Sequence, residues 1–117
     1  MGLSVLFITH DLALAKKTSD RLAVILSGRI VEEGPTSEIV SHPLHPYTKA
    51  LIDFAPLLED RLGRNTAQTI PNIKRQTSAI ASGCPYAHRC PGAKNRCFED
   101  NPELNACSPR KAACFYP

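Results

Sequence analysis

The residues of this chain best suited to chemistry are its five cysteines, which all lie in the last third of the sequence. They are Cys84, Cys90, Cys97, Cys107 and Cys114. Thiols clustered in a short segment indicate either a metal centre or a set of disulfide bonds. The N-terminus does not resemble a signal peptide, so we expect the chain in the reducing cytosol, where clustered cysteines more often bind metal.

The spacing of the cysteines bears on which metal would bind. Five residues separate Cys84 from Cys90, six separate Cys90 from Cys97, and sixteen separate Cys97 from Cys114. Structural zinc sites favour pairs with about two to four intervening residues, whereas wider spacings suit an iron–sulfur cluster. The residues alone leave an iron–sulfur cluster, zinc, and no metal or disulfides as alternatives. A secreted disulfide-bonded domain fits poorly with an odd number of cysteines and no signal peptide.

An apolar run at residues 3–8 predicts a strand buried on both faces, as in a parallel sheet. His10 follows its carboxyl end, which is the edge at which open α/β sheets bind ligands. A helix capped by Asp11 or Thr9 is predicted to continue to about Ser19. Since a lone parallel strand needs neighbours and none precedes it, we expect the end of a larger α/β domain.

A β-hairpin is predicted next, with residues 21–26 and 29–33 on either side of a Ser27-Gly28 turn. Short helices are expected at about residues 36–40 and 47–54. The polar stretch from about residue 59 to 80 lacks a sustained apolar period, and it is predicted to be a linker with a short extended piece at Thr69-Ile70.

The bulk composition excludes several classes of protein. The net charge is only +3 and the basic residues are scattered, so we expect no nucleic-acid partner. No segment approaches the roughly 20 apolar residues of a transmembrane helix. An apolar content of 43% is that of an ordinary soluble protein.

Four motifs, in order along the chain, resemble the nucleotide-binding domains of ABC transporters. Residues 2–12 (GLSVLFITHDL) resemble the H-loop segment, and residues 20–34 (DRLAVILSGRIVEEG) resemble the hairpin that follows it. Residues 42–51 (HPLHPYTKAL) resemble the C-terminal extension of the oligopeptide/dipeptide importer ATPases. Residues 83–91 (GCPYAHRCP) and the later cysteines match the same subfamily.

The resemblance implies an α/β fold in which the C-terminal piece of an ABC-type nucleotide-binding domain precedes a small, loop-rich cysteine module. The implied elements of that piece are a strand, a helix, a β-hairpin and short helices. We expect residues 1–56 to form the nucleotide-binding part with its H-loop, residues 57–80 a linker, and residues 81–117 a metal-binding tail.

The resemblance also implies roles for particular residues. His10 corresponds to the switch histidine, which contacts the γ-phosphate of ATP and helps to position the attacking water. The matching cysteines of the family hold a [4Fe–4S] cluster, and zinc is the alternative cofactor. The corresponding residues here are Cys84, Cys90, Cys97 and Cys114. Cys107 falls outside the pattern, either as a spare buried thiol or as a replacement for Cys114. From the residues themselves, with prolines at 43 and 46 that set a bend, His42, His45 and Tyr47 are expected to cap or pack rather than to form a metal or substrate site.

By resemblance, the chain is a fragment of the ATP-binding subunit of a peptide ABC importer at the cytoplasmic face of the membrane. Its implied partners are transmembrane permease subunits and a second ATP-binding subunit. ATP and Mg²⁺ would be bound only by the complete subunit. The chain contains no Walker A, signature or Walker B motif, so we expect that alone it neither binds ATP tightly nor hydrolyses it. The alternative is a stand-alone metal-binding interaction module without ATPase activity.

Overall fold

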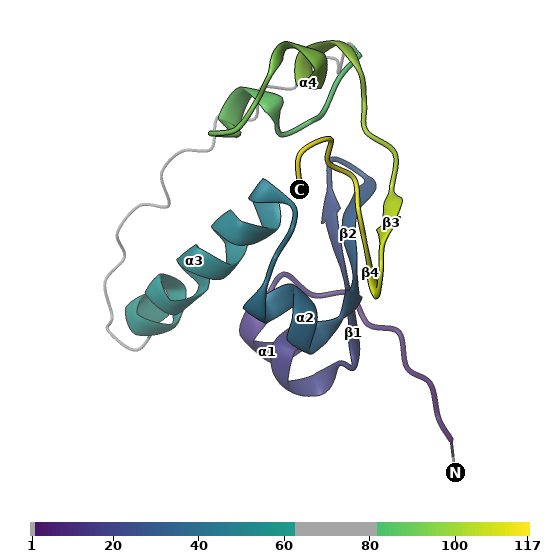
Figure 1. Cartoon of the computed structure of the whole chain (residues 1–117). Helices are drawn as coiled ribbons and strands as arrows, with labels where there is room; N and C mark the ends of the chain where they lie inside the picture. The colour runs from purple at the N-terminus through teal and green to yellow at the C-terminus, as the bar shows by residue number, and fades with distance from the viewer. Residues whose placement is uncertain (1, 63–81) are drawn as a thin grey trace.

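A computed structural model describes residues 2–62 and 82–117, which form an α/β arrangement around one antiparallel sheet (Figure 1). The elements, in chain order, are α1 (Leu12–Thr18), β1 (Arg21–Leu26), β2 (Arg29–Pro35), α2 (Thr36–Ser41), α3 (Pro46–Leu62), the 3₁₀ turn η1 (Ala87–Arg89), α4 (Asn95–Glu99), β3 (Asn105–Cys107) and β4 (Arg110–Ala112). No helix in these two stretches has both the length and the apolar character needed to cross a membrane.

The predicted hairpin is confirmed and forms one half of the sheet. Strands β1 and β2 pair antiparallel. Ser27 and Gly28 between them both have positive φ, at 51° and 76°. Two consecutive positive φ angles give the backbone twist that two-residue hairpin turns require.

The other half of the sheet comes from the C-terminal segment. The strand order is β1-β2-β4-β3, with every neighbouring pair antiparallel. Glu32 of β2 lies opposite Ala112 of β4, and the amide of Ala113 donates to the carbonyl of Val31 at 2.8 Å. The hairpin and the tail therefore share one sheet, although their strands are far apart in the sequence. The boundaries of the three expected segments stay a prediction.

The predicted helix after His10 is confirmed as α1. The carboxylate of Asp11 accepts a hydrogen bond from the amide of Leu14 at 3.0 Å, which caps the helix N-terminus. At the other end, the hydroxyl of Thr36 donates to the carbonyl of Ser19 at 2.8 Å. This bond ties the end of α1 to the start of α2.

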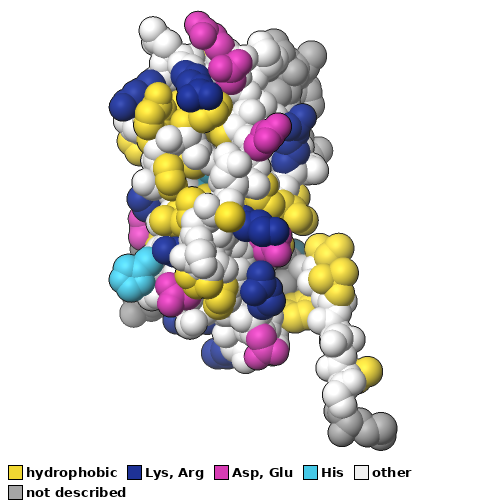
Figure 2. Space-filling model, turned by 45° about the vertical axis from the view of Figure 1, so that its right-hand side comes forward, with side chains coloured by type: hydrophobic (Ala, Val, Ile, Leu, Met, Phe, Trp, Pro, Cys, Tyr) yellow, Lys and Arg dark blue, Asp and Glu magenta, His cyan; other side chains and the backbone are white. Residues whose placement is uncertain are grey.

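The prediction of a buried strand at residues 3–8 is wrong for the described chain. The segment has no strand assignment, and its side chains are exposed, with Leu3 at 84%, Leu6 at 93% and Ile8 at 89%. A strand needs backbone partners on a neighbouring strand, and this segment pairs with none of the four strands, although β1 and β3 each have an outer edge. Figure 2 shows the N-terminal segment standing away from the body, with apolar side chains along it.

Helix α3 is longer than predicted, because it continues to Leu62 instead of ending near Phe54. Residues 57–62, expected to belong to the linker, are helical. They are mostly good helix formers. The rest of the predicted linker, with the extended piece at Thr69-Ile70, lies outside the described residues.

Arg110 of β4 attaches the tail to α2. Its guanidinium donates to the carbonyl of Glu38 at 3.3 Å and to the carbonyl of His42, both at the C-terminal end of that helix. The Glu38 carbonyl also accepts the amide of His42 at 2.9 Å. Gly34 of β2 leaves room for this side chain, since a Cβ there would lie 2.7 Å from Cγ of Arg110. The end of α2 and the turn after it are therefore held against the sheet.

Candidate metal centre

Four of the five cysteines line one small cavity with a volume of about 20 Å³. The residues lining it are Cys84, Cys90, Cys97 and Cys114 together with His45, Pro46, Tyr86, Ala87, Pro102 and Phe115. Cys107 lies on β3 and does not line the cavity. The four lining cysteines are the ones that the family resemblance implies as metal ligands.

Short elements of the tail carry the four thiols to the cavity. Cys84 precedes η1, Cys90 directly follows it, Cys97 lies in α4, and Cys114 follows β4. The amide of Cys84 donates to the carbonyl of Cys97 at 2.8 Å, which fixes the first loop against α4. A backbone hydrogen bond thus helps to hold cysteines from separate elements around the same cavity.

Gly83 permits the close approach of the first loop to α4. Its φ is +131°, a conformation that residues with a side chain rarely adopt. A Cβ at this position would lie 2.6 Å from the carbonyl oxygen of Phe98. Only glycine therefore fits the point where the backbone turns into Cys84.

The surroundings of the cavity disfavour the deprotonated, thiolate form of its cysteines in the metal-free protein. Burial raises the pKa of the Cys84 and Cys114 thiols, and the neighbouring sulfurs raise both further. Backbone amides act in the opposite direction; that of Tyr116, for example, donates to Sγ of Cys114 at 3.4 Å. A bound cation would supply the positive charge that stabilises the thiolates, so metal binding would release protons.

The thiols are the soft donors that zinc and iron–sulfur clusters take in proteins. Across residues 2–62 and 82–117, no three or more His, Cys, Asp or Glu side chains form a group that could hold a metal ion as they stand. The four cysteines line one shared space.

Glu32 is a second buried group at this end of the molecule, and the sequence did not single it out. Its carboxylate is fully buried on β2 and accepts hydrogen bonds from the amides of Leu44, at 2.9 Å, and His45, at 3.0 Å. The only sequence signal is the pair Glu32-Glu33, because adjacent strand residues face opposite sides and one of them must face inward.

His45 caps α3, which begins at Pro46. Nδ1 of His45 accepts a hydrogen bond from the amide of Tyr47 at 3.0 Å, and proline is favoured at the first helical position. The imidazole is buried, and burial lowers the pKa of His45 although Glu32 partly opposes this shift. His42 is different, since it is exposed and its Nδ1 lies 3.0 Å from the hydroxyl of Ser41.

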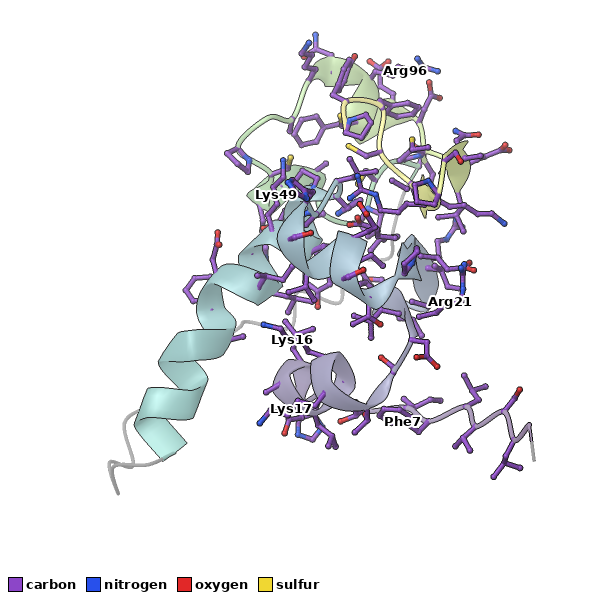
Figure 3. The ribbon with its side chains drawn as sticks, turned by 60° about the horizontal axis from the view of Figure 1, so that its bottom comes forward. Phe7, Lys16, Lys17, Arg21, Lys49 and Arg96 are labelled. Atoms are coloured by element: carbon purple, nitrogen blue, oxygen red, sulfur yellow. The ribbon has the colours of Figure 1, made fainter. Side chains whose placement is uncertain are left out.

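His10 lies in another region. It is exposed, just before α1, and it does not line the cysteine cavity. Figures 1 and 3 place the N-terminal segment with Phe7 and helix α4 with Arg96 at opposite ends of the molecule. The structure thus assembles the four cysteines and does not bring His10 to them.

The chain is similar to proteins of peptide transport. Residues 31–97 match the family described as oligopeptide/dipeptide transporter, C-terminal region. The oligopeptide transport ATP-binding protein OppF of Salmonella typhimurium is 39% identical over 116 residues, which cover 98% of this chain and 35% of OppF. The protein named "Probable D,D-dipeptide transport ATP-binding protein DdpD" of Escherichia coli is 36% identical over 118 residues, covering 99% of this chain and 35% of DdpD. The chain spans about a third of the length of the curated relatives it matches.

The substitution Glu32→Gln is expected to lower the free energy of unfolding by about 1–3 kcal/mol, because one buried amide N–H would face an amide group in place of a carboxylate oxygen. Glu33→Gln is the matched control, since Glu33 makes a partly exposed ion pair with Arg21 at 3.4 Å, worth about 0–1 kcal/mol. Urea denaturation of both variants measures the difference. Equal losses would contradict the role assigned to Glu32.

The substitution Gly83→Ala is expected to cost about 1–3 kcal/mol from backbone strain and to lower the melting temperature by several degrees. Gly92→Ala in the same tail is the control, because a Cβ there would meet nothing within 4 Å. Thermal unfolding followed by circular dichroism compares the two. An unchanged melting temperature in Gly83→Ala would show that the loop does not need this conformation.

Proposed function

This chain belongs to the family of the oligopeptide/dipeptide transporter C-terminal region, and we propose that it acts as the C-terminal part of the ATP-binding subunit of a peptide importer. The observation that carries the proposal is the 36–39% identity to peptide-transport ATP-binding proteins over 97–99% of the chain. Both the N-terminal segment with His10 and the cysteine tail lie within this similarity.

When two complete ATP-binding subunits come together, ATP binding closes their domains against each other and hydrolysis reopens them. That cycle drives peptide uptake through transmembrane permease subunits, with the ATP-binding subunits on the cytoplasmic face of the membrane. This chain supplies His10 to the nucleotide site. The exposure of that imidazole supports the assignment, since it is free to reach a phosphate held by other elements.

The chain alone neither binds ATP tightly nor hydrolyses it. Phosphoryl transfer depends on a backbone cradle for the phosphates, a lysine, and a carboxylate that holds Mg²⁺. The sequence contains no glycine-rich loop followed by Lys and Ser or Thr. ATP and Mg²⁺ are therefore ligands of the complete subunit.

The cysteine tail holds a [4Fe–4S] cluster in this proposal, with Cys84, Cys90, Cys97 and Cys114 as ligands and zinc as the alternative metal. Three features support the fit: four thiols line one cavity, the fifth does not, and a backbone amide donates to Sγ of Cys114. Such a cluster, when bound, supplies one-electron redox chemistry and a cross-link between segments.

The chain's own residues prepare this site in three ways. The four thiols lose their protons on binding, and backbone N–H groups offset part of the resulting negative charge. Pro46, Pro102 and Phe115 line the cavity with apolar surface that limits the access of water. The role of the centre is structural or redox-sensing, because it lies at the opposite end of the molecule from the segment with His10.

The metal assignment is tested by purifying the chain without oxygen and measuring iron, sulfide and zinc. We expect about four irons and four sulfides per chain, with a broad absorption band in the visible. Cys97→Ser should lose the cluster, whereas Cys107→Ser should keep it. One zinc without iron would refute the cluster, and an equal loss in Cys107→Ser would refute the ligand set.

The transport assignment is tested with a chimera in which this chain replaces the matching region of OppF. In a strain that lacks OppF, the chimera should restore the uptake of a labelled oligopeptide. His10→Ala in the chimera should abolish uptake, while His42→Ala should leave it intact. A chimera that is present at the membrane in normal amount and restores nothing would contradict the proposal.

A further inference from the structure

We propose that His45 donates a hydrogen bond from Nε2 to a sulfur of the cluster in the cysteine cavity and thereby raises its reduction potential. The inference rests on the proposed function, which supplies the cluster. It assigns a role to a histidine outside the cysteine tail, in the turn before α3. His45 would be a positioning and tuning residue and not a ligand.

The local hydrogen bonds determine which nitrogen of His45 carries the proton. The amide of Tyr47 lies 3.0 Å from Nδ1, and a backbone N–H can only donate. Nδ1 therefore accepts and carries no proton. A neutral imidazole has one N–H, which must then be on Nε2.

The Nε2–H group is a buried donor without an acceptor. His45 is only 1% exposed, and Nε2 has no hydrogen-bond partner among the described residues. The other two buried side-chain atoms in this condition belong to Thr48 and Arg110, neither of which lines the cavity. An unpaired buried donor costs free energy, so this site favours a bound group that offers an acceptor.

The cavity determines the chemistry of that acceptor. His45 lines it beside the four cysteines, and most other lining side chains are apolar. The exception is Tyr86, whose ring lies 6.1 Å from the His45 ring, centroid to centroid, without a hydrogen bond to Nε2. A cluster adds inorganic sulfides and thiolate sulfurs, which are negatively charged acceptors.

The same geometry argues against His45 as a metal ligand. Coordination through Nε2 would require that nitrogen to give up its proton, and a neutral ring would then carry the proton on Nδ1. A proton on Nδ1 would face the N–H of Tyr47, which already occupies that position. Donation from Nε2 is the arrangement that leaves both nitrogens satisfied.

Two hydrogen bonds keep the imidazole in place. The amide of His45 donates to Glu32, and its Nδ1 holds the first turn of α3. Hydrogen bonds to cluster sulfurs stabilise the more negatively charged reduced state, so they raise the potential. Burial also lowers the pKa of His45, which helps to keep the ring a neutral donor.

The test compares His45→Asn with His45→Gln in the full chain, purified without oxygen. Asparagine offers an oxygen close to the Nδ1 position for the Tyr47 amide but reaches no donor into the cavity, whereas the longer glutamine amide reaches toward the Nε2 position. At a fixed potential, we expect about a tenfold lower ratio of reduced to oxidised cluster in His45→Asn, a shift of about 59 mV for a one-electron couple. His45→Gln should shift less, and the exposed-site control His42→Asn should not shift.

The outcomes separate this inference from the proposed function. A full complement of iron and sulfide with equal potentials in all variants would overturn the role of His45 and leave the cluster intact. Zinc alone, or no metal, in the unaltered chain would overturn both.

A second measurement covers the case in which His45→Asn does not fold. In the unaltered chain labelled with ¹⁵N-histidine, pulsed EPR of the reduced cluster should show a hyperfine coupling to one imidazole nitrogen. Its absence would overturn the inference without any variant.

Discussion

The buried carboxylate of Glu32 connects the main parts of this molecule. It lies on β2, the strand that pairs with both the hairpin partner β1 and the tail strand β4. Its two oxygens accept the amides of Leu44 and His45, which are the last residues before α3. A buried carboxylate must be fully hydrogen-bonded, so this one fixes the turn into α3 relative to the sheet. The placement of the His45 ring over the cysteine cavity depends on that turn.

The cysteine cavity is a joint product of two regions that look independent in the sequence. The tail supplies the four thiols, and the turn before α3 supplies His45 and Pro46. The tail is held there by the pairing of β4 with β2 and by Arg110, which donates to carbonyls at the end of α2. A group bound in the cavity would therefore stabilise the contact between the two regions, because it binds only when they are assembled.

The N-terminal segment has the opposite character. Its apolar residues are exposed, and it pairs with no strand of the sheet. Exposed apolar residues in a row mark a surface that another element covers. The role proposed for His10 also requires elements that this sequence does not contain, because a histidine contacts a γ-phosphate only where other residues hold the nucleotide.

The sequence by itself determined the local structure. The helix cap, predicted at Asp11 or Thr9, and the Ser27-Gly28 turn depend on neighbouring residues, and both were readable from residue types at fixed spacing. The strand predicted at residues 3–8 failed, because a strand exists only with a partner and the partner is a tertiary property. Likewise, only the tertiary structure decided that Glu32 is buried, that Cys107 lies apart from the other four thiols, and that His45 faces them. These relations join residues distant in the sequence, and neither spacing nor periodicity encodes such contacts.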